Sequence, residues 1–138
     1  MRLILSIPFL AIVILAYILL AVLGGMIDPL STVWNGVLPS ADELFLDAGS
    51  FFLIAGLFGL FLEILKAARL SSGTIADHML STATFIGALI AFLLLPGCGN
   101  ATFLMLTIMA LIDVVAGYSV SILSARRDYT VSHSDGGL

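Results

Sequence analysis

The sequence has few charged residues and few side chains that bind metals. Only 10% of its 138 residues are charged, and it holds one cysteine and two histidines. Soluble domains carry about 25% charged residues, so this composition excludes a water-soluble globule, a disordered chain and a nucleic-acid binder. One cysteine excludes an internal disulfide. One cysteine and two histidines are also too few ligands for a zinc or haem site of ordinary ligation. We therefore expect no metal and no cofactor.

Apolar residues are abundant instead. They make up 61% of the chain, and the mean hydropathy is +1.21. A helix needs about 20 mostly apolar residues to cross a bilayer, whereas a spanning strand needs about 9–11 residues of alternating polarity. We therefore expect an all-α integral membrane protein. It would be one domain over residues 1–127, an antiparallel bundle of transmembrane helices at residues 3–23, 49–68, 75–95 and 101–125.

The cationic residues indicate how these helices face. Lys and Arg gather in the cytoplasmic segments of membrane proteins. All five cations fall on one side of the expected bundle: Arg2, Lys66, Arg69, Arg126 and Arg127. Both termini are thus expected in the cytoplasm. The first span is longer than the h-region of a signal peptide, about 7–15 residues, which favours an uncleaved anchor. The polar tail, 128–138, is expected to be disordered.

The loop between the first two spans is the largest expected segment outside the membrane. We expect a short interfacial helix near residues 29–35, with Trp34 as an anchor at headgroup level. The capping-box pattern of residues 40–43 predicts that the second helix begins near Ser40. Asn100 can cap the fourth helix, and Pro8 predicts a mild kink in the first.

Small residues recur at a spacing of four in three of the expected spans. Helices in lipid pack closely through such residues. On the fourth span, Asp113 and Ser121 share the face that carries the small residues. The expected packing faces are Ala55 and Gly59, then Ala83, Gly87 and Ala91, then Ala110 and Gly117.

Asp113 lies near the middle of the fourth span. An ionised Asp there costs about 2.5–3.5 kcal/mol, so an ionisable residue inside a membrane is a functional candidate. A hairpin of the last two spans brings Thr84 to a similar depth. Asp113 could bind a proton or a cation, or it could be a neutral acid that locks helices by bonding to Thr84 or a carbonyl. We prefer the lock, because one Asp without an intramembrane partner makes a poor relay.

Glu63 lies one turn from the cytoplasmic end of the second span, three residues before Lys66, so a helical ion pair is expected. The alternative is a polar cluster that binds an ion, a lipid headgroup or a partner helix. That cluster would join Glu63 to His78, Ser81, Thr82 and Ser121. His78 itself is expected to be interfacial or capping rather than a ligand.

Cys98 lies in a Gly-Cys-Gly turn. We expect it to be exposed on the oxidising side, either as a free thiol or in an intermolecular disulfide.

Three stretches resemble an uncharacterised family of small four-span bacterial inner-membrane proteins. They are FLEILKAAR at 61–69, DHMLS at 77–81, and MALIDVVAGYSV at 109–120 followed by ARRD at 125–128. The resemblance implies a multi-pass protein of the bacterial inner membrane. It implies no activity, because none is established for that family.

No phosphate-binding loop, metalloprotease motif or nucleophile–base set is present. The first functional hypothesis is therefore a non-enzymatic accessory or scaffold protein. Its partners would be the lipid bilayer and either a membrane protein or a second copy. The alternative is an oligomeric proton- or cation-linked transporter or channel using Asp113 and Glu63. A weaker alternative is a membrane enzyme acting on a lipid or quinone beside His78 and Glu63.

Overall fold

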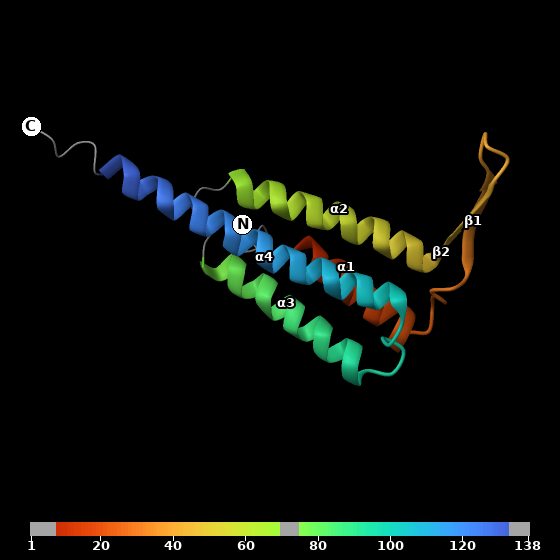
Figure 1. Ribbon diagram of the computed structural model, residues 1–138. Helices are drawn as coiled ribbons and strands as arrows, with labels where there is room; N and C mark the ends of the chain where they lie inside the picture. Colours follow the sequence, from red (N-terminus) through yellow and green to blue (C-terminus); the bar gives the residue numbers. More distant parts are fainter. Residues whose placement is uncertain (1–7, 70–74, 133–138) are drawn as a thin grey trace, which may run out of the picture.

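The computed structural model describes residues 8–69 and 75–132. Most of this chain is helical, and four helices each run antiparallel to the next (Figure 1), the first of them, Phe9–Leu23, being made of two consecutive elements. The elements in chain order are α1 (Phe9–Tyr17), η2 (Ile18–Leu23), β1 (Thr32–Val37), β2 (Glu43–Asp47), α2 (Ala48–Arg69), α3 (Ile75–Leu94) and α4 (Ala101–Ser132).

Three of these helices are long and apolar enough to cross a membrane. Their apolar stretches are Ala48–Ala67, Asp77–Leu94 and Ala101–Leu123. The helix that α1 and η2 form together, Phe9–Leu23, is apolar but shorter. The beginning of the first expected span lies outside the described residues.

Helix α4 is the centre of the bundle. It contacts α1, α2 and α3, and α1 also packs on α2. Figure 1 shows α4 between α2 and α3. Most side chains of the buried core correspondingly come from α1 and α4, such as Leu10, Phe103, Leu106 and Ala110.

The outward helix faces carry large apolar side chains. Phe51, Leu57 and Phe58 on α2 and Leu93 on α3 are exposed. A water-soluble monomer rarely exposes so much contiguous apolar surface. A bilayer can cover such faces, because helices satisfy their own backbone hydrogen bonds there.

The expected interfacial helix near residues 29–35 is wrong, and so is an entirely helical fold. This segment forms an antiparallel hairpin in which Asn35 pairs with Phe45 and Gly36 with Leu44. β-Branched and aromatic residues favour strands. The Trp34 ring lies directly over Gly36 and occupies the space that a Cβ at this position would need. Just before the hairpin, the Asp28 carboxylate accepts a turn hydrogen bond from the Leu30 N–H, 3.0 Å.

The second helix does not begin near Ser40, as the capping pattern predicted. Residues 38–42 make the hairpin turn, where the Ser40 hydroxyl donates to Asp42 at 2.7 Å and Ala41 has a φ of 68°. The helix cap is Asp47, whose carboxylate accepts bonds from the Ser50 N–H at 2.7 Å and from its hydroxyl at 2.6 Å. These bonds favour the charged form, so Ser50 lowers the pKa of Asp47.

The ends of the other helices follow the sequence more closely. Pro8 precedes the first residue of α1 in an extended conformation, a position where its missing N–H costs no helical hydrogen bond. The irregularity in this helix is instead the π-helical turn η2. Helix α4 continues to Ser132, into the segment that was expected to be a disordered tail.

Asn100 caps α4 as predicted. Its side-chain oxygen accepts the Phe103 N–H at 3.0 Å, and its amide donates to the Gly97 carbonyl at 2.8 Å and to the Tyr17 hydroxyl at 2.9 Å. The Tyr17 ring lies 5.1 Å from that of Phe52 and 5.3 Å from that of Phe103. One side chain therefore joins the start of α4 to the buried aromatic cluster.

Replacing Asn100 by Ala should lower the free energy of unfolding by about 1–2 kcal/mol, because the cap is lost and the Tyr17 hydroxyl loses a partner. Denaturant titration in detergent, followed by circular dichroism, measures this change. Asn100→Asp is the matched control, since it keeps the acceptor for Phe103 and should lose less. Equal stability of Asn100→Ala and the wild type would contradict the assigned role.

Candidate functional site

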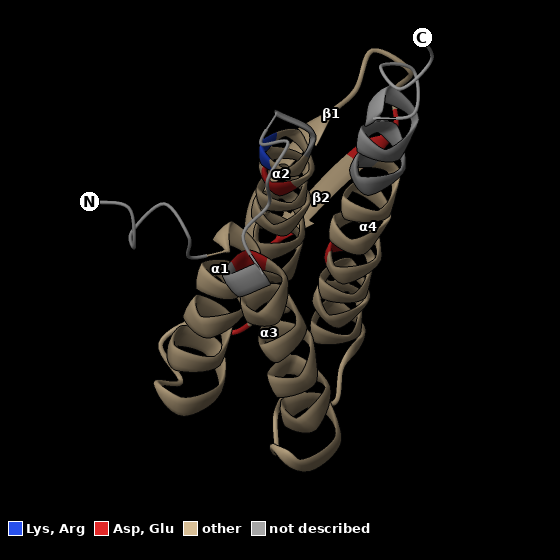
Figure 2. Ribbon diagram, turned by 90° about the vertical axis from the view of Figure 1, so that its left-hand side faces the viewer, with Lys and Arg blue, Asp and Glu red and all other residues tan. Residues whose placement is uncertain are grey.

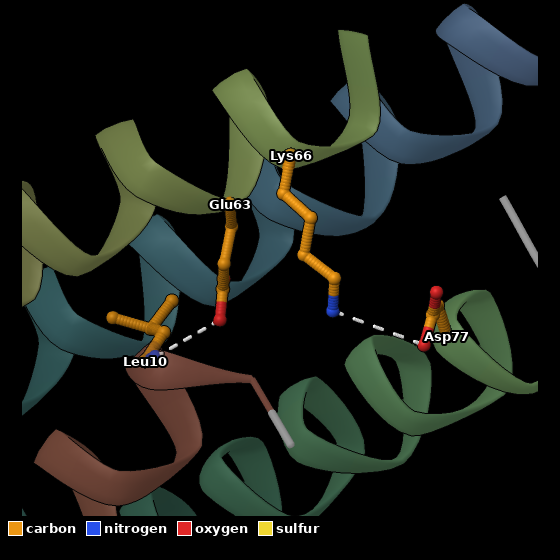
Figure 3. A network of polar contacts seen from close by, with 4 residues as sticks. All are labelled: Leu10, Glu63, Lys66 and Asp77. Carbon is orange, nitrogen blue, oxygen red and sulfur yellow. Dashed lines mark hydrogen bonds and ion pairs between the residues drawn. The ribbon is translucent and has the colours of Figure 1, made fainter. Parts of the chain in front are cut away.

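Glu63 of α2 holds the beginning of α1. The first N–H groups of a helix have no partner within it, and that of Leu10 donates to Glu63 Oε1 at 3.1 Å. Figure 3 shows the carboxyl group reaching across from α2 to the first turn of α1. The side chain is buried, with 8% of its surface exposed. A carboxyl group on a neighbouring helix thus caps α1 where Pro8 supplies no side-chain cap.

Asp113 of α4 is the second carboxyl group of this site. It is also 8% exposed, and it lies within hydrogen-bonding and electrostatic range of Glu63. Thr84, the partner expected for Asp113, donates its hydroxyl to the Leu80 carbonyl of its own helix at 2.9 Å. We call Glu63 and Asp113 together the acid pair.

One oxygen of the acid pair is left over. Among the described residues, Glu63 Oε2 is buried without a hydrogen-bond partner. A buried polar atom without a partner carries its full desolvation cost. Such an atom calls for an explanation in terms of a proton, an ion or a ligand.

Lys66 lies beside the acid pair and interacts with Asp77 as well as with Glu63. It acts electrostatically on Glu63, and its ammonium lies 3.9 Å from the Asp77 carboxylate on α3. Figure 3 shows this ion pair bridging α2 and α3 next to Glu63. Figure 2 shows acidic and basic residues of α2 close together near one end of that helix.

The expected polar cluster is divided in two. His78 hydrogen-bonds to Ser121 of α4 and stacks on the Tyr118 ring at 5.3 Å. Thr82 donates to the His78 carbonyl at 2.7 Å. A Cβ on Gly117 would lie 2.9 Å from the imidazole, so the glycine makes room for the histidine. These residues join α3 to α4, whereas Glu63 joins α2 to α1 and α4.

Ser81 is half-buried on α3. Across the two described segments of the chain, no group of three or more His, Cys, Asp or Glu residues could hold a metal ion.

The small residues pack partly as predicted. Ala110 is buried, Gly59 lies against the backbone of α1 and Ala91 packs at the edge of the core. The remaining three predicted positions, Ala55, Ala83 and Gly87, are exposed.

The buried small residues are instead their chain neighbours. Gly56 lies against Leu106 and Met109 of α4, and Ala88 is 2% exposed. One residue along a helix is a rotation of about 100°, so the small-residue pattern located these faces one position away. The spacing of seven between Gly49 and Gly56 is the signal that identifies the inner face of α2.

Cys98 is buried, not exposed as expected. Its exposed fraction is 0%, its thiol is free, and burial raises its pKa. A thiolate is needed for disulfide exchange. The structure therefore favours a free thiol over the intermolecular disulfide.

Trp34 lies half-exposed on β1. The hairpin projects sideways from the end of the bundle that also holds the turn between α3 and α4 (Figure 1). An aromatic ring there is suited to a membrane surface.

Comparison of the chain with protein-family models, with curated proteins and with solved structures finds no match. The acid pair and the His78 cluster are therefore interpreted from their chemistry alone.

Cys98 should react slowly with a thiol reagent in the folded protein and quickly after denaturation, because the buried thiol is protonated and inaccessible. Mass spectrometry after timed treatment with a maleimide measures this. A variant carrying Cys98→Ser with Gly99→Cys is the control, since the position of Gly99 is open and its thiol should react at once. Equal rates at the two positions would contradict the burial of Cys98.

Proposed function

We propose that the chain is a multi-pass protein of the bacterial inner membrane, with four spans and both termini in the cytoplasm. Three helices of sufficient length and the apolar Phe9–Leu23 helix support four spans. Lys66 lies near the C-terminal end of α2, while the hairpin and the 96–100 turn lie at the opposite end of the bundle (Figure 1). The described part of those outer segments carries acids and no Lys or Arg, which supports this orientation.

Its function, on this proposal, is that of a non-enzymatic accessory or scaffold subunit. The observation that carries it is the outer face of α3. At Gly87 nothing lies within 4 Å of where a Cβ would be, and Ala83, one turn earlier, is exposed. Small residues on a lipid-facing helix surface allow close approach of another helix. This face suits a membrane-protein partner or a second copy.

The polar groups inside the bundle support the same function. Hydrogen bonds join Glu63 to the Leu10 N–H, Asn100 to the Tyr17 hydroxyl and His78 to the Ser121 hydroxyl. Each contact joins two helices. An enzyme acting on lipid or quinone is not proposed, because the His78 ring is engaged by Ser121 and Tyr118.

Replacing Gly87 by Leu should weaken association about tenfold, about 1.4 kcal/mol, while leaving the fold intact, because the added side chain meets only the partner. Chemical crosslinking in native membranes, followed by purification in mild detergent, measures the association. Gly99→Leu adds the same side chain at another open position and should associate normally. Gly56→Leu should instead lower stability, because Leu106 occupies that space.

Two outcomes would contradict the scaffold function. In one, the wild-type protein purifies alone, with neither a partner nor self-association. In the other, Gly87→Leu and Gly99→Leu associate to the same extent as the wild type.

Proton- or cation-linked transport is the second candidate, and the acid pair favours it. Ionisable residues within membrane spans mark ion and proton paths. Four helices of one chain fill their own centre, so a conducting path would require an oligomer.

In proteoliposomes, Asp113→Asn should reduce proton or cation flux to the level of protein-free vesicles if Asp113 couples transport. The fluorescence of a pH-sensitive or cation-sensitive dye trapped inside the vesicles measures this flux. Asp42→Asn, in the exposed hairpin turn, is the control and should leave the flux unchanged. Equal flux in the wild type and Asp113→Asn would exclude Asp113 as the coupling residue.

A further inference from the structure

The acid pair combines two features that neither carboxyl group has alone. Both side chains are more than nine-tenths buried, and they lie within hydrogen-bonding range of each other. Oxygen Oε2 of Glu63 is buried without a partner in the described part of the chain, while Oε1 is occupied by the Leu10 N–H. Two carboxylates can only accept hydrogen bonds, so the contact between them lacks a donor.

We propose that Glu63 and Asp113 together bind one proton, carried on Glu63 Oε2 and donated to the Asp113 carboxylate. That proton turns the unpartnered oxygen into a hydrogen-bond donor. It also removes one of two negative charges that would otherwise face each other inside the bundle. Two carboxyl groups a few ångströms apart in a protein interior can both be ionised only at a large cost in free energy.

The surroundings favour one bound proton over two. On α2, the Lys66 ammonium acts on Glu63, although it also lies 3.9 Å from Asp77 of α3. From α1, the Leu10 N–H and the positive end of that helix face the pair. On the α3 side, His78 contacts α4 at Gly117, one turn beyond Asp113. The Lys66 ammonium and the start of α1 stabilise a single remaining negative charge on the pair, and a second proton would remove that charge.

The ligands present suit a proton better than a metal ion. Ca²⁺ takes about six to eight oxygen ligands, and Mg²⁺ about six. Among the described residues, no third His, Cys, Asp or Glu joins the pair in a group that could hold a metal ion. A proton needs one donor oxygen and one acceptor, which the pair supplies. This inference is independent of both proposed functions, because a proton can be bound without being transported.

A protonated carboxyl group buried in an apolar bundle has a characteristic reaction with an apolar carbodiimide such as dicyclohexylcarbodiimide. The acid adds across one C=N bond: its oxygen bonds to the central carbon, and its proton moves to the nitrogen. The acyl group then migrates to nitrogen as a stable N-acylurea. Nothing leaves and nothing is oxidised, so the mass increases by one whole reagent molecule. An ionised carboxylate lacks the proton that this addition requires.

The test treats the full chain in lipid nanodiscs with dicyclohexylcarbodiimide and locates the adduct by peptide mass spectrometry. One adduct per chain is expected at Glu63 or Asp113 at neutral pH. Above the titration midpoint, the rate should fall about tenfold per pH unit. Glu63→Gln and Asp113→Asn should each abolish labelling of the remaining acid, because the new amide supplies the missing donor and lets that acid ionise. Glu43→Gln, on the exposed strand β2, should change nothing.

Infrared spectroscopy gives a second measurement that does not depend on access of the reagent. The wild type should show a protonated-carboxyl C=O band that shifts in D₂O and is absent from both single variants. Thermal unfolding confirms that the variants fold. Absence of this band in the wild type at neutral pH would overturn the proposal, as would undiminished labelling of the remaining acid in the variants. Protection by added Na⁺, K⁺ or Ca²⁺ at constant pH would assign the site to a cation instead.

Discussion

The contact between the Glu63 carboxylate and the first turn of α1 is the interaction on which the arrangement of the bundle depends. Apolar burial gives little preference for one helix contact over another when lipid covers the outside, so hydrogen bonds and close packing select the contacts. Glu63 joins α2 to α1 through the Leu10 N–H and meets α4 at Asp113. Gly59 allows α1 to approach α2 next to this contact. Three helices therefore meet at one carboxyl group.

The opposite end of the bundle uses the same principle with neutral groups. Asn100 caps α4 and reaches Tyr17, whose ring packs on Phe52 and Phe103. Asp47 caps α2 where the hairpin ends. Each polar side chain at these ends satisfies a helix terminus and also positions a neighbouring element. The outer face of α3 at Gly87, by contrast, packs against no other part of the described chain.

The sequence predicted the candidate residues better than their partners. Asp113, Glu63 and His78 were identified from their polarity within apolar stretches, and all three make contacts between helices. The partner of Asp113 was missed, because a hairpin of the last two spans fixes depth but not rotation. Thr84 was expected at the same depth, yet its hydroxyl bonds to its own helix, and the acid that lies within hydrogen-bonding range of Asp113 belongs to α2.

What the sequence by itself determined are the properties that depend on neighbouring residues along the chain: three long apolar helices, their approximate ends and the Asn100 cap. Tertiary structure decided the rotation of each helix, since one residue corresponds to about 100°; Gly56 is therefore buried where Ala55 was expected. It also decided the hairpin at Thr32–Asp47, because a short segment of mixed polarity has no periodicity that separates strand from helix. The acid pair exists only because packing brings α2 and α4 together.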